Sequence, residues 1–406
     1  MSLLALALLA LPAPGAVQAP KDGAARRPDP YSEDAPELRK LAGYVSYGPF
    51  PLAKDDARVE FGTRDVEKAL GDIEILWVET AHFRIGSTLP AYVAEDKKER
   101  DKLRLELAEL RRIFPQVDPE QRKLDPWLRL HLYARRLEDL YADFQRRLGR
   151  TDADFPAGPG TLVNGEYRGD GPYLGQPGKY VLLLFEKSSS VGRFFGRFTA
   201  TPEDRSRRHN FPHSGTLLMA ISTEYGDGAL KNDTALHCSV VFNQVHNLVS
   251  GYKFYTVELP IWWKEGLAHW YARRVDPSYN NFSAVTEEAA ETRSTWNWPP
   301  KVRGRVKNDY YPGAAELTAW TDFDGRRLAD HMMMWSRVDY LMSLGDAGFA
   351  TFMDMMKGSY PGITCAPTPE QVLARQQEAL QQAWSLDADA FDRQWAEYVL
   401  KTYPGK

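Results

Sequence analysis

The sequence has little cysteine and no large excess of charge of either sign. Only Cys238 and Cys365 occur among the 406 residues, which is too few for the disulfide framework of a small secreted domain. They either form one bond or remain two separate buried thiols. The 51 Lys and Arg residues stand against 55 Asp and Glu, and the net charge of −4 comes without a basic stripe. This balance argues against nucleic acid as a partner.

Long hydrophobic runs are also missing. Beyond the N-terminus, no apolar stretch reaches the roughly 20 residues that a transmembrane helix needs. The one short run, residues 3–11, has the length of a signal-peptide core, and Val17 and Ala19 follow at positions −3 and −1 of a cleavage site. We therefore expect residues 1–19 to be a signal peptide and the mature protein to be exported, extracellular or periplasmic, and soluble.

What the sequence does contain is an ordered series of strand and helix patterns. Residues 20–37 are rich in proline and charge, which predicts a flexible leader. Strand signals lie at residues 73–87, 179–189 and 215–224, and helical periodicities lie at residues 96–114 and 125–149. This order predicts one α+β domain over residues 38–406. Its sheet lies before about residue 233, two helices span about 234–274, and the part from about 275 to 406 is mostly helical.

Two of the helical segments carry residues in the arrangement of a zinc site. A hydrolytic zinc centre needs three protein ligands, an open position for water and a base that takes the proton of that water. A helix with two histidines four residues apart supplies two ligands from one face. The window FNQVH, residues 242–246, has this frame with His246 in the second ligand position. Glu265 follows nineteen residues later, within WWKEGLAHW.

This pair of motifs resembles the active-site helices of the gluzincins, the peptidase MA-like zinc metallopeptidases, whose pattern is HExxH followed by a W-x-x-E-G-x-A helix. The segments WSRVDYL, FATFMDMMKG and LDADAFDRQWAEYVLKTY are similar to the helical C-terminal half of such domains, and WVETAHFRIGSTLP resembles their opening strand. The resemblance extends over about residues 73–403. It implies a zincin-like metallopeptidase fold with a small mixed sheet, paired active-site helices and a helical C-terminal half.

The sequence departs from the family pattern at positions that the catalytic chemistry of the family requires. Phe242 stands at the first ligand position and cannot bind a metal ion, and Asn243 stands at the general-base position and cannot exchange a proton near neutral pH. Only His246 and Glu265 match the ligands of the family, and two protein ligands are too few for a zinc site. We therefore expect a non-catalytic pseudopeptidase without a cofactor, in which these two residues remain as a buried polar pair.

A remodelled metal site is the first alternative. His269 follows Glu265 by four residues, so the two side chains leave the same face of their helix. The resemblance to thermolysin-like gluzincins places His269 near Phe242. A triad of His246, Glu265 and His269 would then bind zinc, and hydrolysis would still lack a base in its usual place. In the simpler interpretation His269 is an interfacial histidine without a ligand role.

The former active-site groove gives the other expectation. Trp296, Trp298, Tyr310 and Tyr311 lie in an aromatic segment, and the resemblance places His331 near a tyrosine position of related domains. Aromatic rings beside arginine and asparagine suit a peptide or glycan chain. We expect the groove to bind a peptide, a glycan or a protein partner. In the simpler interpretation these rings pack on the domain. If Phe242 and its neighbours plug the groove, the protein is a structural envelope or extracellular component with a filled groove.

Overall fold

The computed structural model describes residues 27–32, 35–199, 201–224, 228–254, 257–283, 296–323, 325–358 and 367–405. The predicted signal peptide lies outside these residues, as does Cys365. The described part of the predicted leader is packed against the domain. Asp29 is buried, and its Oδ1 lies 3.1 Å from Nε2 of His131. The leader is held here because its short polar side chains supply partners for a buried histidine.

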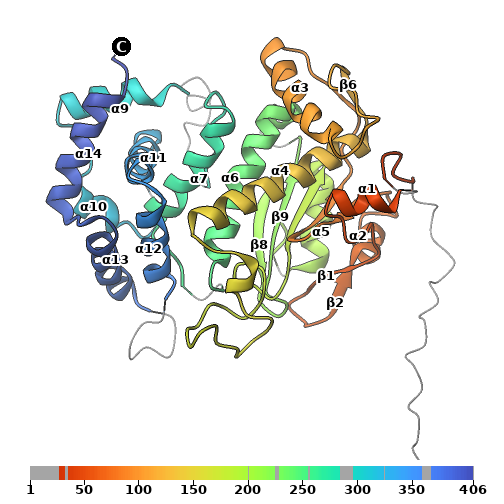
Figure 1. Ribbon diagram of the computed structural model, residues 1–406, viewed down its shortest axis with the longest axis horizontal. Helices are drawn as coiled ribbons and strands as arrows, with labels where there is room; N and C mark the ends of the chain where they lie inside the picture. The colour runs from red at the N-terminus through yellow and green to blue at the C-terminus, as the bar shows by residue number, and fades with distance from the viewer. Residues whose placement is uncertain are drawn as a thin grey trace, which may run out of the picture.

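A mixed five-stranded sheet forms the centre of the N-terminal half (Figure 1). The strand order is β3-β4-β7-β9-β8. The three inner strands are parallel to one another, whereas each edge strand is antiparallel to its neighbour. The strands are β3 (Leu76–Glu79), β4 (Phe83–Ser87), β7 (Tyr180–Phe185), β8 (Arg207–Phe211) and β9 (Thr216–Ser222).

Helices cover both faces of this sheet. Leu182 and Leu184 of β7 belong to a hydrophobic cluster with α4 (Pro126–Arg147) and α6 (Asp233–Gly251). The alternate residues of the same strand belong to a second cluster with α2 (Thr63–Ala69) and α5 (Ser188–Phe198). Because strand side chains alternate between faces, a strand covered on both sides is a continuous apolar run. This explains the apolar pattern of residues 179–189.

The remaining elements of the N-terminal half lie around the sheet. Two short antiparallel pairs accompany it, and two further helices complete this half. The strands are β1 (Pro51–Lys54), β2 (Glu60–Gly62), β5 (Tyr92–Val93) and β6 (Lys123–Leu124), and the helices are α1 (Pro36–Leu41) and α3 (Lys97–Arg111).

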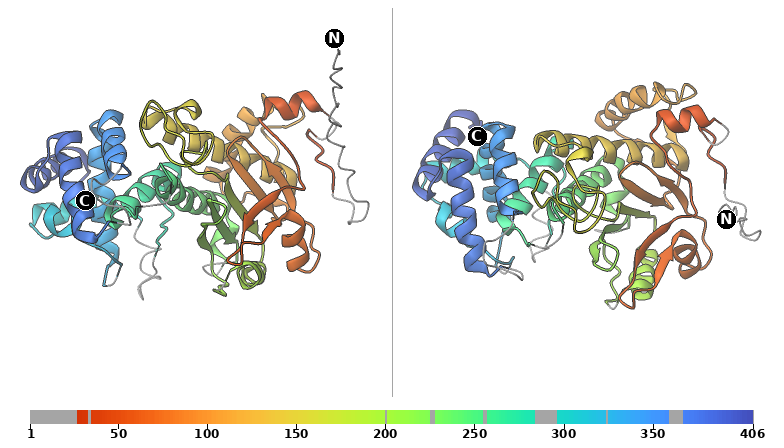
Figure 2. Two further views of the ribbon diagram at one scale, coloured as in Figure 1. Left: turned by 90° about the horizontal axis from the view of Figure 1, so that it is seen from below. Right: turned by 60° about the horizontal axis from the view of Figure 1, so that its bottom comes forward.

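The C-terminal half is helical, as predicted (Figures 1 and 2). α7 (Ile261–Val275) packs against α6 on one side and against α11 (Leu328–Ser343) on the other. One hydrophobic cluster extends from the sheet through these helices, so the two halves share a core. The other helices are α9 (Trp298–Lys307), α10 (Ala314–Thr318), α12 (Asp346–Met356), α13 (Pro369–Trp384) and α14 (Ala388–Thr402).

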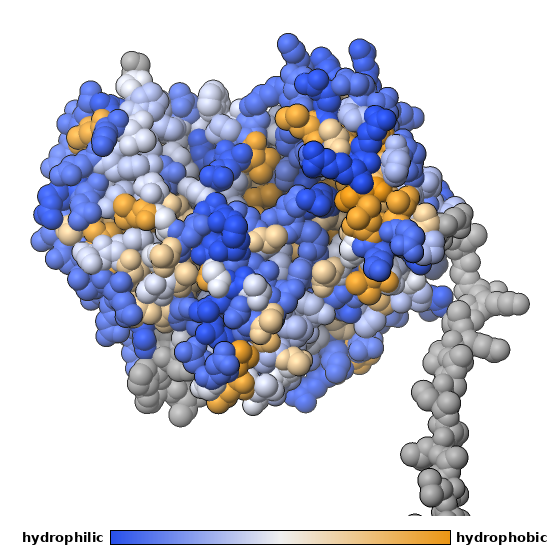
Figure 3. Space-filling view, viewed as in Figure 1, coloured by the Kyte–Doolittle hydropathy of each residue, from blue (hydrophilic) through white to orange (hydrophobic). Residues whose placement is uncertain are grey.

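The α+β class, the mixed sheet and the helical C-terminal half are thereby confirmed. Within the described part of the chain, no helix combines the length and the apolar character that crossing a bilayer requires. The face of the molecule in Figure 3 is mostly hydrophilic, with hydrophobic residues in separate patches.

Candidate functional site

Four polar side chains from three helices meet in the centre of the molecule. α6 supplies His246, α7 supplies Glu265 and His269, and α11 supplies His331. None of the four is more than 4% exposed. α6 is buried around nearly its whole circumference, which is typical of a core helix. Its few polar side chains therefore need partners inside the protein.

The carboxylate of Glu265 is the centre of this cluster. Its Oε1 lies 3.3 Å from Nδ1 of His331 and 3.6 Å from Nε2 of His269. The same oxygen accepts a hydrogen bond of 3.1 Å from the backbone N–H of Ser283. The two histidine nitrogens are 3.2 Å apart. These three atoms, which come from α7 and α11 and could each act as a metal ligand, thus enclose one small space.

The second oxygen of the carboxylate is less well satisfied. Nε2 of His246 lies 3.2 Å from Oε2 of Glu265, but Oε2 accepts no hydrogen bond from any described residue. The ion-pair partners of Glu265 in the described chain are all histidines, without a lysine or arginine among them. Among the described residues, this fully buried carboxylate is thus accompanied by imidazoles and a backbone N–H instead of a permanent cation.

Burial controls the protonation of the cluster. It lowers the pKa of His246 to about 3, and the positive charge of Arg208 acts in the same direction. Burial also holds the pKa of His269 well below its ordinary value. For Glu265 burial acts in the opposite sense, but the neighbouring His246 and His331 outweigh it and hold the pKa well below the usual range. A neutral imidazole, as in His269, and an ionised carboxylate, as in Glu265, are the forms that bind metal ions.

Phe242 fills the first ligand position of the family pattern. Its ring centroid lies 5.0 Å from the ring of His246 and 5.1 Å from the ring of His269, and the side chain is buried. These are ordinary aromatic packing distances. A hydrophobic ring therefore occupies the space beside His246 and His269.

Asn243 is held by two hydrogen bonds. Its Oδ1 accepts from Arg208 of β8 at 2.7 Å, and its Nδ2 donates to the carbonyl of Ser239 at 2.9 Å. Arg208 also donates to Oγ of Ser283 at 3.1 Å, and that hydroxyl lies 3.3 Å from Nε2 of His246. Arg208 and Ser283 thus join the edge strand to the cluster. The sequence analysis missed both, because nothing in their local pattern marks them as neighbours of the motif helices.

The position of His331 depends on a close approach between α7 and α11. A Cβ atom at Gly266 would lie 2.5 Å from the backbone oxygen of Met334, closer than such atoms can pack. Gly266 directly follows Glu265, so the missing side chain lets α11 approach α7 beside the carboxylate. This glycine belongs to the W-x-x-E-G pattern that the sequence shows.

The cluster differs from the expected triad in one member. Glu265, His269 and His331 have ligand atoms that all lie within 4.8 Å of one another. His246, which the sequence analysis placed in the triad, instead contacts the opposite oxygen of Glu265. His331 was expected in a groove, and the structure places it against the carboxylate.

The four aromatic groove candidates do not form one surface. Trp298 is buried with its ring 4.9 Å from His269, and Tyr311 packs against Trp395. Trp296 and Tyr310 are exposed, with exposed fractions of 43% and 71%. Tyr310 lines a pocket on the C-terminal half.

Cys238 of α6 is buried and reduced. Its Sγ lies 3.6 Å from the carbonyl oxygen of Asp276, and burial raises the pKa of the thiol to about 12. The expected alternative of a bond to Cys365 falls on a residue outside the described part of the chain.

A scan of the chain against models of protein families gives no match, and neither does a search of curated proteins.

Proposed function

We propose that the protein is an exported, non-peptidase relative of the gluzincins with a zincin-like fold, and that it binds a zinc ion through Glu265, His269 and His331. This is the remodelled-site alternative with His331 in place of His246. The observation that carries the proposal is the triangle formed by Oε1 of Glu265, Nε2 of His269 and Nδ1 of His331.

The sides of this triangle fit zinc coordination. They measure 3.2, 3.3 and 3.6 Å. Tetrahedral zinc with bonds of about 2.0–2.1 Å keeps neighbouring ligand atoms about 3.3–3.4 Å apart. Two imidazole nitrogens and one carboxylate oxygen also favour zinc over magnesium or calcium, which prefer oxygen ligands.

Neighbouring residues support the ligand role of Glu265. The N–H of Ser283 holds Oε1, and Nε2 of His246 lies beside Oε2. Contacts of this kind orient a metal-binding carboxylate and tune its basicity. In this arrangement His246 is a positioning residue, and the unsatisfied Oε2 is the atom it acts on.

The same site does not favour the peptidase mechanism of the family. That mechanism needs a base beside the ligands, and the corresponding Asn243 is an amide held by Arg208 and Ser239. Phe242 fills the position of the first ligand. A bound zinc ion would supply Lewis acidity, but the chain offers no proton acceptor at the family position.

The test is the zinc content of the full chain, purified without chelator and measured by mass spectrometry. We expect about one zinc ion per chain, which Glu265→Gln and His331→Ala should each abolish. His213→Ala is the matched control, because His213 is an exposed histidine away from the three ligand residues. A casein assay on the zinc-loaded protein should detect no hydrolysis.

Two results would overturn the proposal. A chain that takes up no zinc from a micromolar solution would leave the four side chains as a structural network, and Phe242 would then mark a filled groove. Casein hydrolysis that disappears in Glu265→Gln would show that this chain is a working peptidase despite Asn243.

A further inference from the structure

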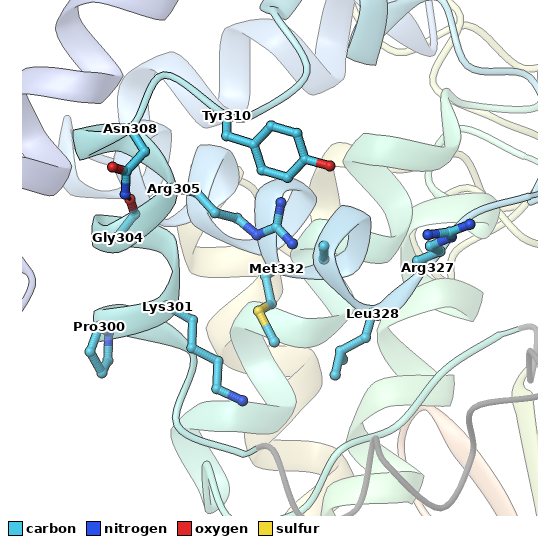
Figure 4. A pocket seen from close by; sticks show the side chains of 10 residues that line it. Pro300, Lys301, Gly304, Arg305, Asn308, Tyr310, Arg327, Leu328 and Met332 are labelled. Atoms are coloured by element: carbon cyan, nitrogen blue, oxygen red, sulfur yellow. Dashed lines mark hydrogen bonds between the residues drawn. The ribbon is translucent and has the colours of Figure 1, made fainter. Parts of the chain in front are cut away.

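A second candidate site lies in the C-terminal half, in a pocket of about 600 Å³. One wall is α9 with the loop that follows it, and the other is the start of α11 (Figure 4). Leu328 and Met332 of α11 line this pocket, whereas His331 of the same helix contacts Glu265. The volume lies within the range of ordinary small-molecule sites, roughly 300–1,000 Å³.

Three cationic side chains line this pocket, and none of the described lining residues is acidic. Lys301 and Arg305 lie one helical turn apart on α9, and Arg327 lies across from them at the start of α11. Figure 4 shows the ends of Lys301 and Arg305 directed toward Met332 in the middle of the pocket. None of the three forms an ion pair with a described residue, whereas most arginines in the core of this protein do.

The nearest acidic residue of α11 is already engaged. Oδ2 of Asp330 accepts a hydrogen bond of 2.8 Å from the backbone N–H of Arg327, as a capping carboxylate does. The start of α11 adds its own partial positive charge to the same pocket. Positive charge therefore dominates the lining.

An aromatic ring and an amide complete the lining. Tyr310 is 71% exposed, and the guanidinium of Arg305 lies 5.1 Å from the centroid of its ring. Figure 4 shows the ring directly above Arg305. Nδ2 of Asn308 donates to the carbonyl of Gly304 at 2.7 Å, so this amide is held against α9.

We infer that this pocket binds a small anionic glycan, about two sugar rings long, that carries carboxylate or sulfate groups. Arginine forms paired hydrogen bonds to such planar or trigonal anionic groups. Tyr310 offers its exposed ring for stacking against a sugar. Three cations spread around the pocket suit several anionic groups on one molecule better than a single ion. The site is independent of the proposed metal ligands.

The test is titration calorimetry of the full chain at low salt with three disaccharides. One is neutral, one carries a uronic acid, and one carries the same uronic acid with two sulfate groups. We expect affinity to rise along this series, with the sulfated sugar at least tenfold tighter than the neutral one. Arg305→Gln should weaken the sulfated sugar about tenfold, and Tyr310→Ala should weaken all binding several-fold.

Lys307→Gln is the matched control, because Lys307 is an exposed cation of the same helix outside the pocket lining. It should change affinity less than twofold, and thermal midpoints should match among the variants. The inference fails if no sugar binds, if all three bind equally, or if Lys307→Gln weakens binding as much as Arg305→Gln. Binding of inorganic sulfate as tightly as the sulfated sugar would also overturn it, because the site would then take only an ion.

Discussion

Asp233 and Glu265 are both fully buried carboxylates next to α6, and they are neutralised in different ways. Asp233 opens α6 and faces Arg136, with Oδ2 2.7 Å from the guanidinium, while Oδ1 accepts from the hydroxyl of Tyr133. Arg129 lies 3.9 Å away as a second cation. Within the described part of the chain, the ion-pair partners of Glu265 are all histidines. The first carboxylate therefore has permanent cations as partners, whereas the second has imidazoles.

Both carboxylates have a pKa well below the usual range, but the groups that lower it differ. Burial alone would raise the pKa of Asp233, but the charge of Arg136 outweighs it and holds the pKa well below the usual range. Because a guanidinium is permanently charged, Arg136 compensates the charge of Asp233 without a bound ion. At Glu265 the neighbours His246 and His331 lower the pKa instead, and no described lysine or arginine forms an ion pair with this carboxylate.

The largest expected effect is at Asp233. Asp233→Asn leaves Arg136 and Arg129 buried beside an uncharged group, and removing one partner of a buried pair costs about 3–5 kcal/mol. We expect that loss in the free energy of unfolding, measured by urea denaturation, with or without zinc. Asp139→Asn on α4, which breaks an exposed pair with Arg135, should change it by less than about 0.5 kcal/mol.

The same pair predicts a pH dependence with a definite sign. Because the pKa of Asp233 is depressed in the folded protein, its contribution is complete above the ordinary value of 3.8 and is lost as the pH falls below it. The wild type should therefore lose more stability than Asp233→Asn between pH 4 and pH 2. Equal losses in both proteins would show that the pair does not control acid unfolding.

The second expected effect is specific to Glu265. Zinc at a hundred times its dissociation constant should stabilise the wild type by about 2.7 kcal/mol, while Glu265→Gln should show no zinc effect. Without zinc, the variant should be less stable than the wild type near neutral pH, because the depressed pKa of Glu265 means that the fold stabilises its ionised form. Thermal unfolding with and without zinc measures both effects. Zinc stabilisation of Glu265→Gln equal to that of the wild type would contradict this expectation.

Lys357 extends the comparison to a buried lysine that has no carboxylate partner among the described residues. Its Nζ donates to the carbonyls of Ser250 and Val257, and burial lowers its pKa to about 7 from 10.5. Between these values the unfolded chain binds more protons, so stability should rise with pH. We expect the wild type to gain about 1–2 kcal/mol over Lys357→Met between pH 7 and pH 9. Parallel urea curves at both pH values would contradict this expectation.

The smallest expected effect distinguishes the two ligand sets. If His246 only orients Oε2 of Glu265, His246→Ala should weaken zinc binding by less than tenfold, or about 1.4 kcal/mol. His331→Ala should weaken it at least a hundredfold. Competition with a fluorescent chelator measures both variants. The reverse order would restore the triad of His246, Glu265 and His269.

Periodic patterns allowed much of the fold to be predicted. The apolar runs gave β7 and β9, and the spaced leucines gave α3 and α4, because burial on one or both faces leaves a regular pattern. Residues 73–87 are two strands instead of one, since a turn separates β3 from β4. α9 was also missed. It starts with Trp298 and two prolines, and prolines are tolerated in the first turn of a helix.

The candidate site was predictable only where its members share a helix. Glu265 and His269 stand four residues apart, so their common face follows from the helical period. His331 lies sixty-two residues further along, and only the packing of α11 on α7 brings it to the carboxylate. Arg208 and Ser283 come from a strand and a loop for the same reason. No local sequence pattern encodes contacts between residues that lie so far apart in the chain.

Gly266 matters for the design of mutagenesis at this site and for how easily the site could be lost in evolution. A scan that removes donor side chains would pass over this residue, since it has no side chain to remove. Yet Gly266→Ala would force the backbone of Met334 to move and would carry His331 away from Glu265 without altering any ligand. The proposed metal site would therefore depend on one absent methyl group, and a single mutation there could erase it while every ligand residue remained in the sequence.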